Sequence, residues 1–254
     1  MKVVILAGGL GTRLSEETVI HPKPMVEIGN RPIIWHILKY YSMFNFNNFY
    51  VALGYRGEVI KRYFMDYQIY DRNIKINLTD NQLDFLDSKV DDWTIHLIDT
   101  GFSTNTGGRL KRLQPYLQSE SFMLTYGDGV STVDLRALLD FHKLHGRMVT
   151  ITAVHPPARF GGLDLEGDVV INFFEKSQIR EGWINGGFMV LNPEIFDYIE
   201  GDETILEADV LERLTAERQV CAYRHPYFWQ CMDTLRDKRY LEELWAAGAP
   251  WKIW

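Results

Sequence analysis

Near its N-terminus the sequence reads Lys2-Val-Val-Ile-Leu-Ala-Gly-Gly-Leu-Gly-Thr-Arg-Leu14, an apolar run of strand length that leads into a turn with three glycines. Glycines let the backbone approach an anion closely and direct several N–H groups at it. Arg13 ends the turn, and Lys23 follows ten residues later between two prolines that stiffen its segment. The strand, the turn and the two cations together predict a site for a polyphosphate.

The turn differs from two familiar phosphate-binding motifs. It lacks the Lys-Ser/Thr pair that completes a P-loop, and Thr12-Arg13 stands where a dinucleotide fingerprint needs its third glycine. A guanidinium suits a triphosphate, whereas a plain turn has no need of one. From local sequence alone, a tight structural turn and a surface position for Lys23 remain open alternatives.

Composition limits the class of protein. The 254 residues are 46% hydrophobic and 24% charged, as in ordinary globular proteins, and suffice for a sizeable core. A net charge of −7 argues against a nucleic-acid or membrane-surface partner. We find no apolar run of about 18 residues, the length of a membrane span. Two cysteines, Cys221 and Cys231, favour a reducing cytoplasm over a disulfide framework.

The pattern of apolar residues predicts alternating strands and helices. Strands are expected at 3–6, 49–53, 93–98, 122–125, 149–154, 169–174 and 188–191. Helices are expected from Pro32 through 41 and at 58–67, 204–217 and 234–245. A further helix is expected to begin at a cap formed by Asp134 and to end at Gly146, with a buried side made of Leu135, Leu138, Leu139 and Phe141. This alternation predicts an α/β fold with a mostly parallel sheet whose carboxyl edge binds ligand. The acidic segment 80–92 reads as a solvated loop or hairpin, with a lid or subunit contact as the alternative.

Asp128 lies in Gly127-Asp-Gly129, just beyond the predicted strand 122–125. Mg²⁺ commonly takes one or two protein carboxylates and completes its shell with water and phosphate oxygens. Asp233 is the candidate for the second carboxylate. The alternatives are a simple Gly-Asp-Gly turn at Asp128 and a helix N-cap at Asp233, and local sequence favours the N-cap.

A basic segment follows Thr104, with Arg109, Lys111 and Arg112 after a glycine pair. If these glycines open a helix, the cations fall in its first turn, which the helix dipole disfavours. We therefore expect them to accept a base or a phosphate, with a solvated helix face as the alternative.

A further set of polar residues flanks two later strands. Glu175 and Lys176 follow the strand at 169–174, and Asn185-Gly-Gly187 precedes the strand at 188–191. A lysine at a strand end can anchor a sugar phosphate. Carboxylate, amide and glycine backbone groups suit sugar hydroxyls.

These motifs, taken together, resemble those of the sugar-1-phosphate nucleotidyltransferases. The match comprises Leu6 to Leu14, Pro22-Lys-Pro24, Gly127-Asp-Gly129, Glu175-Lys176 and Asn185-Gly-Gly187, and it runs nearly end to end. The segments 99–112, 228–238 and 249–254 are similar to the branch of this family that transfers cytidylyl groups to glucose 1-phosphate.

The resemblance implies a Rossmann-like mixed sheet, flanked by helices, with a smaller sugar-binding and oligomerisation part. It implies one domain over 1–254, with 1–130 mainly nucleotide-binding and 131–254 mainly sugar-phosphate binding and oligomer contacts. The implied reaction joins CTP and α-D-glucose 1-phosphate into CDP-glucose and pyrophosphate, with Mg²⁺, for the 3,6-dideoxyhexoses of O-antigens. The expected assembly is a homo-oligomer, a hexamer. Alternatives are UTP, dTTP or another sugar phosphate as substrate, and a nucleotide-sugar-sensing regulatory subunit.

The resemblance also implies a role for each matching residue. The catalytic residues are Arg13, Lys23 and Asp128, and Mg²⁺ binds Asp128 and Asp233. Nucleotide contacts fall on Leu6, Ala7, Gly8, Gly9, Leu10, Gly11, Thr12, Arg13, Lys23, Thr104, Arg109 and Asp128. Sugar-phosphate contacts fall on Tyr126, Glu175, Lys176, Asn185 and Gly187.

Two positions depart from the family pattern. Ser177 follows Lys176 where a proline is expected. In the segment 204–211, Ile205, Leu206 and Asp209 stand where an aromatic residue and a glutamate are expected. These differences concern contacts around the sugar and leave the phosphate-binding residues unchanged.

Overall fold

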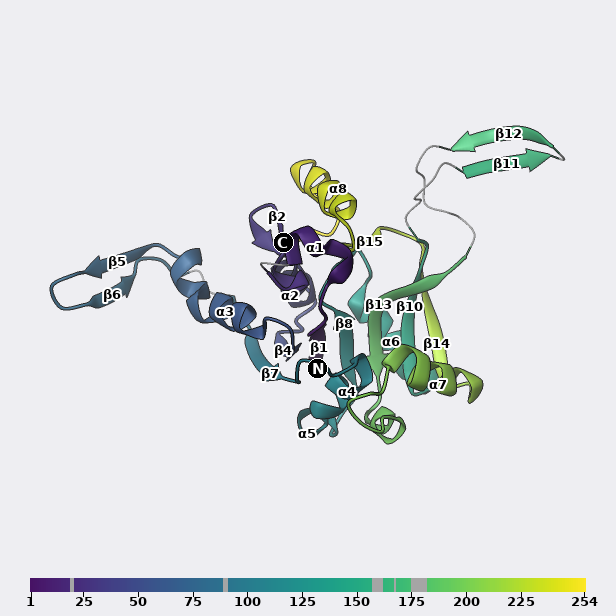
Figure 1. Cartoon of the computed structure of the whole chain (residues 1–254), viewed down its shortest axis with the longest axis horizontal. Helices are drawn as coiled ribbons and strands as arrows, with labels where there is room; N and C mark the ends of the chain where they lie inside the picture. The colour runs from purple at the N-terminus through teal and green to yellow at the C-terminus, as the bar shows by residue number, and fades with distance from the viewer. Residues whose placement is uncertain (19–20, 89–90, 157–161, 167, 175–181) are drawn as a thin grey trace.

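The computed structural model describes residues 1–254 except 19–20, 89–90, 157–161, 167 and 175–181. Its central sheet has seven strands in the order β14-β10-β13-β8-β1-β4-β7 (Figure 1). They are β1 (Lys2–Ala7), β4 (Asn48–Leu53), β7 (Thr94–Asp99), β8 (Phe122–Tyr126), β10 (Val149–Val154), β13 (Ile184–Leu191) and β14 (Val220–His225). Only β13 runs antiparallel to its neighbours in this sheet as described. The predicted mixed, mostly parallel sheet is confirmed.

Most of the main helices lie close to where helical spacing predicts them, and the short helix α5 was not predicted. They are α2 (Ile33–Ser42), α3 (Gly57–Asp71), α4 (Thr106–Arg112), α5 (Gln114–Leu117), α6 (Leu135–His145), α7 (Glu212–Ala216) and α8 (Leu235–Ala246). Asp134 caps α6 as predicted, because its carboxylate accepts from the N–H groups of residues 136 and 137. Two details were wrong. Pro32 precedes α2 and belongs to the short strand β3 (Arg31–Pro32), and His142 takes the buried position expected for Phe141.

The predicted helix over 204–217 is divided in two. A π-helical turn, η4 (Leu206–Leu211), comes first and α7 continues it. Its buried side chains (Leu206, Val210, Leu211 and Leu214) are the expected apolar set without Ile205, which is 42% exposed. The described residues include no helix long and apolar enough to cross a membrane.

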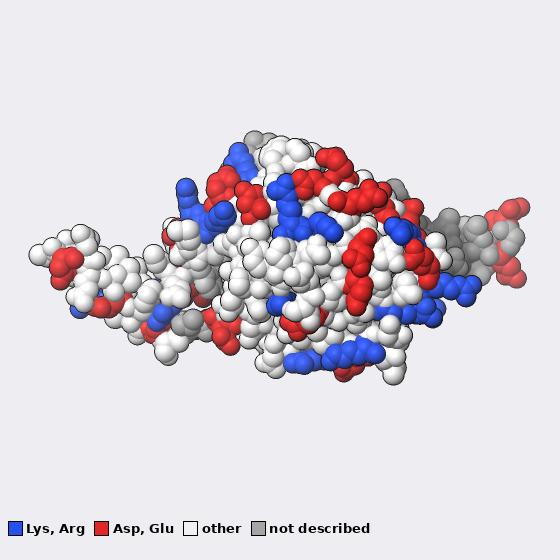
Figure 2. Space-filling view, turned by 90° about the horizontal axis from the view of Figure 1, so that it is seen from below, with Lys and Arg blue, Asp and Glu red and all other residues white. Residues whose placement is uncertain are grey.

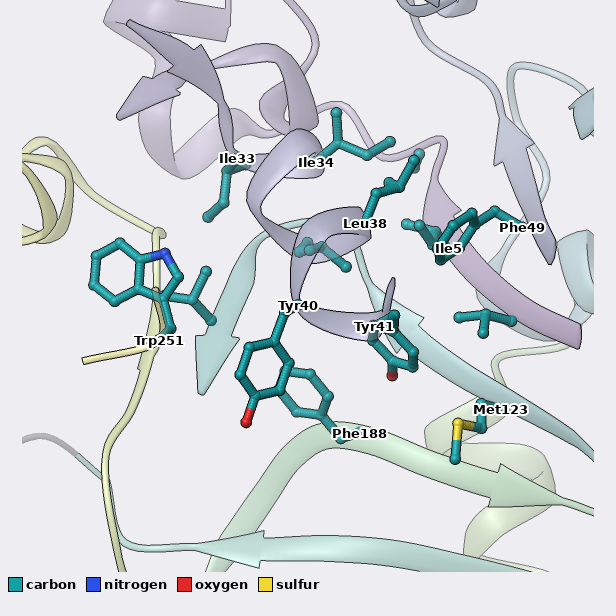
Figure 3. Packing of buried hydrophobic residues seen from close by; sticks show 14 of the residues in the cluster. Ile5, Ile33, Ile34, Leu38, Tyr40, Tyr41, Phe49, Met123, Phe188 and Trp251 are labelled. Atoms are coloured by element: carbon teal, nitrogen blue, oxygen red, sulfur yellow. The ribbon is translucent and has the colours of Figure 1, made fainter. Parts of the chain in front are cut away.

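Two hydrophobic cores cover the two faces of the sheet, because successive side chains of β1 point to opposite sides. Val3 and Ile5 contribute to the core beneath α2, which also takes in Trp251 near the C-terminus (Figure 3). Val4 and Leu6 contribute to the second core, together with α4, α5 and the segment from η3 (Pro193–Tyr198) to α7. Both cores are continuous across β1 and β8, so the carboxyl ends of these strands sit on a rigid base.

Two hairpins project from the body at opposite ends (Figure 1). One joins β5 (Ile74–Asn77) to β6 (Gln82–Phe85) beyond α3, and the other joins β11 (Gly162–Glu166) to β12 (Val169–Phe174). The acidic segment 80–92, expected to be a loop or a hairpin, thus supplies the second strand, β6, of the hairpin beyond α3, and its remaining described residues are not in a strand. Asp91 is not simply solvated, since it forms an ion pair with Lys39 and accepts from the Tyr67 hydroxyl at 2.6 Å.

Candidate active site

An open cleft of about 410 Å³ lies at the carboxyl ends of β1 and β8. The chain passes from β1 to β4 on one side and later enters β8 on the other, so this is the topological switch point where open α/β sheets bind ligands. The cleft is lined by Leu6, Ala7, Gly8, Gly9, Gly11, Thr12, Lys23, Pro24, Thr104, Asn105, Thr106, Arg109, Tyr126, Gly127, Asp128 and Asp233. The cleft thus contains most of the residues predicted to bind nucleotide.

Lys23 reaches the cleft because its segment packs directly on Gly127. The Gly127 N–H donates to the carbonyl of Leu6 at 3.0 Å, which ties the end of β8 to the end of β1. A Cβ on Gly127 would lie 2.9 Å from Cγ of Pro24, in the short 3₁₀ turn η2 (Lys23–Met25). Only glycine allows this approach, and the approach places Lys23 beside Asp128.

A two-stranded ladder brings Asp233 to the same place. Strand β15 (Trp229–Cys231) pairs antiparallel with β9 (Gly129–Ser131), with Cys231 opposite Gly129. The Met232 N–H then donates to the Asp128 carbonyl at 2.8 Å. The helix N-cap favoured for Asp233 by local sequence was wrong, because Thr234 caps α8 and forms a capping box with Asp237.

The Lys23 ammonium donates to both carboxylates, to Asp128 Oδ2 and to Asp233 Oδ1, at 2.5 Å each. Burial would lower the pKa of Lys23, but the two carboxylates outweigh it and raise the pKa above its ordinary value. Burial and the same carboxylates raise the pKa of the neighbouring Cys231 thiol to about 12, so the thiol stays protonated. One ammonium thus faces two carboxylates at the point of convergence.

This donor set fits a divalent cation. Among the described residues, no three His, Cys, Asp or Glu side chains form a protein-only metal cluster. Two carboxylates that already converge on a cation suit an ion that completes its shell with phosphate oxygens and water. Asp128 and Asp233 are therefore the residues that could hold a metal together with a nucleotide.

Arg109 has a different environment from the one predicted. Helix α4 begins at Thr106, beside the glycine pair as predicted, but it ends at Arg112. Arg109, Lys111 and Arg112 therefore fall in its last turn, where the helix dipole favours cations, and the expectation of a disfavoured first-turn placement was wrong. The Arg109 guanidinium is buried and donates to the carbonyls of Gly8, Leu53, Gly101 and Phe102 and to the Thr100 hydroxyl, at 2.6–3.2 Å. It thus supports the glycine turn from behind.

Of the other predicted nucleotide contacts, Thr104 is buried in the cleft wall and Leu10 is 49% exposed. Arg13 lies on the short helix η1 (Thr12–Leu14) directly after the glycine turn. The direction of its side chain falls outside what the structure describes.

Three of the residues predicted to bind the sugar phosphate lie together. Gly187, with φ of +79°, packs against the Tyr126 ring, and its N–H donates to Asn185 Oδ1 at 2.8 Å. Glu175 and Lys176, predicted for the same role, lie outside the described residues.

Glu207 is a residue that sequence reasoning missed. Its carboxylate accepts from the hydroxyls of Tyr126 at 2.5 Å and Thr106 at 2.7 Å, both in the cleft wall. In the sequence it is one of several acidic residues in a stretch of helical spacing, where a solvent-facing position is the ordinary expectation. Only the fold shows that its helix passes behind the cleft.

A lysine and a pair of carboxylates beside a glycine turn, at the switch point of a parallel sheet, are the features of a phosphoryl-transfer enzyme that acts on nucleotides. The chain belongs to the nucleotidyl transferase family, whose model matches residues 2–237. Nucleotidyltransferases of this family generally use a divalent metal. The fold and the cleft are therefore those of a nucleotidyltransferase.

Comparison with known proteins agrees with this assignment. The chain is 50% identical over 256 residues to the glucose-1-phosphate cytidylyltransferase of Salmonella typhi, covering 100% of both chains. It is 32% identical over 253 residues to the mannose-1-phosphate guanyltransferase of Saccharomyces cerevisiae, covering 95% of this chain and 63% of the yeast protein. The crystal structure of HddC from Yersinia pseudotuberculosis superposes with a TM-score of 0.70 at 24% identity, covering 96% of this chain and 99% of HddC.

Proposed function

We propose that this chain transfers CMP from CTP to α-D-glucose 1-phosphate, giving CDP-glucose and pyrophosphate. The convergence of Lys23, Asp128 and Asp233 beside the glycine turn carries the proposal of nucleotidyl transfer. The choice of cytosine and glucose is supported by the full-length identity of 50% to a glucose-1-phosphate cytidylyltransferase, against 32% to a guanyltransferase. A role in the supply of 3,6-dideoxyhexoses for O-antigens follows as part of the same proposal.

The reaction is an in-line displacement at phosphorus. An oxygen of the sugar phosphate forms a bond to the α-phosphorus of CTP, and the bond to the β-phosphate bridging oxygen breaks, so that pyrophosphate leaves with the electron pair. The nucleophile is already an anion, so a general base is not required. Catalysis therefore depends on alignment and on neutralisation of charge.

Each charged residue of the cleft has a place in that displacement. Lys23 neutralises the α-phosphate, and Arg13 at the end of the glycine turn neutralises the departing pyrophosphate. Asp128 and Asp233 hold Mg²⁺. When bound, Mg²⁺ supplies a Lewis acid that reduces the repulsion between the two phosphates that react.

The remaining cleft residues divide between the two substrates. We assign the backbone of 6–12 and the side chain of Thr104 to the nucleotide, with Arg109 serving nucleotide binding through its support of the glycine turn. Tyr126, Asn185 and Gly187, together with Glu175 and Lys176, are assigned to the sugar phosphate. Residues 1–130 thus supply most nucleotide contacts, and 131–254 supply most sugar contacts, within one domain.

We further propose a homo-oligomer, a hexamer, in the cytoplasm. The β5–β6 hairpin carries exposed apolar side chains, including Leu78 at 84% and Ile76 at 52% exposure. It projects at the left of Figure 2 with few charged residues on the visible surface. Apolar surface of this kind is typical of a protein interface, and the mass of the purified protein by light scattering tests the assembly. The two free cysteines suit a reducing compartment.

A panel of nucleotides tests the function directly. Purified protein is mixed with glucose 1-phosphate, Mg²⁺ and either CTP, UTP, dTTP or GTP, and the release of pyrophosphate is measured. We expect CTP to give the highest kcat/KM. Faster turnover with another nucleotide would reassign the base. Binding of CTP without turnover would instead support a nucleotide-sugar-sensing regulatory subunit.

A further inference from the structure

Glu207 joins the two walls of the cleft without lining it. It lies on η4, and π-helical turns are rare and frequent at functional sites. One carboxylate oxygen accepts from Tyr126, at the end of β8, and the other accepts from Thr106, the first residue of α4. Tyr126 stands beside the residues assigned to the sugar, and Thr106 stands beside Thr104 on the nucleotide side. A single carboxylate therefore links both halves of the site.

The same contacts determine which way both hydroxyls point. Thr106 Oγ1 donates to Glu207 and accepts from the Leu206 N–H at 2.9 Å, so the hydroxyl proton and one lone pair are both occupied by these two hydrogen bonds. Burial and the nearby Glu207 carboxylate raise the pKa of Tyr126, so the phenol stays protonated. Because that proton is donated to Glu207, the phenol oxygen can act toward a ligand only as an acceptor.

Glu207 extends from a segment that is fixed to α4 by backbone hydrogen bonds. The Asn105 N–H donates to the Asp202 carbonyl at 2.9 Å, and the Gly107 N–H donates to the Thr204 carbonyl at 3.0 Å. The segment that carries Glu207 and the first turn of α4 must therefore move as one unit. Glu207 is well placed to transmit the position of that unit to Tyr126.

We propose that Glu207 is a positioning residue for both substrates. It holds Tyr126 so that the phenol oxygen accepts a hydrogen bond from a sugar hydroxyl, and it holds Thr106 so that the start of α4 faces the nucleotide. The identity of the two substrates rests on the proposed function, whereas the link between the cleft walls rests on the geometry alone.

The variant Glu207→Gln tests the inference. An amide offers one uncharged acceptor oxygen and one donor nitrogen, so neither hydroxyl keeps its charged acceptor. We expect KM for each substrate to rise by about tenfold, the effect of losing one hydrogen bond to a charged group at each wall of the cleft. Glu207→Asp is shorter and should give the same pattern with the charge kept. Glu212→Gln makes the same chemical change at an exposed position on α7 and should leave both KM values unchanged.

Double variants separate positioning from a general effect on the fold. In a Tyr126→Phe background, Glu207→Gln should no longer alter KM for the sugar phosphate, and in a Thr106→Val background it should no longer alter KM for the nucleotide. Unchanged KM values in the single variant, or full effects in both backgrounds, would overturn the inference. All variants are assayed with the nucleotide and sugar phosphate that the wild type turns over best. If the wild type turns over none, the Kd of each ligand is measured by calorimetry instead. The test therefore still applies if the nucleotide base is reassigned.

Discussion

Replacement of Arg109 by methionine should destabilise the protein strongly and weaken nucleotide binding as a consequence. The Arg109 side chain, in a residue only 5% exposed, donates to five acceptors. Two of them keep other donors, because the Gly8 carbonyl also accepts from the Tyr55 N–H and the Leu53 carbonyl from the Thr100 N–H. Each of the other acceptors loses a charged donor, at a cost of about 1–3 kcal/mol, and water from the open cleft offsets part of this cost. We therefore expect the free energy of unfolding to fall by about 3–4 kcal/mol.

Urea unfolding measures this loss, and Arg112→Met supplies the control. Arg112 lies on the same helix as Arg109 and pairs with Asp202, but these two side chains are 44% and 46% exposed, so its removal should leave the urea midpoint nearly unchanged. An Arg109→Met protein that unfolds at the same urea concentration as Arg112→Met, yet has a raised KM for CTP, would refute this reasoning. Arg109 would then act mainly through direct contact with the nucleotide.

Three further outcomes follow from the charged and titratable groups. Asp128→Asn should lower kcat by orders of magnitude with little change in urea stability, and near-normal release of pyrophosphate would remove Asp128 from the mechanism. Lys23→Met removes the ammonium that pairs with Asp128 and Asp233, so the free protein should bind Mn²⁺ more tightly by electron paramagnetic resonance; unchanged affinity would contradict the proposed metal site. His36, whose pKa burial lowers to about 4, accepts from Trp251 and must stay neutral. Between pH 6.5 and 4 only the unfolded state protonates this imidazole, so the free energy of unfolding should fall by about 3 kcal/mol as the pH drops through that window. His36→Phe should flatten this dependence of stability on pH. An equally steep dependence in the variant would exclude His36 as the cause.

The sequence predicted the strands and the cleft well because their signals are local. The run before Gly8 has strand composition, and its position at the carboxyl edge of a parallel sheet follows from the alternation of elements. Asp233 shows the limit of such reasoning. Locally it resembles a helix cap, and its true partner, Lys23, is 210 residues away in the sequence. Only pairing of β9 with β15 brings the two together, and short strands of three residues leave little periodicity to detect.

Arg109 and Glu207 show a second limit. Both are charged residues in short helical segments, where the ordinary expectation is a solvated face. Their actual environments depend on which backbone carbonyls and hydroxyls the fold places nearby. The length of α4 decided the case of Arg109, since a helix that ends at Arg112 carries these cations in its last turn.

The ladder between β9 and β15 also affects when the enzyme can first act during its synthesis. Asp128 leaves the ribosome well before Asp233, which lies 105 residues further along the chain. At about 5–20 residues per second, that gap lasts roughly 5–20 s. A nascent chain in this interval has its glycine turn and Lys23 but only one of the two carboxylates. Turnover should therefore begin only after the C-terminal part has emerged and folded back onto β9.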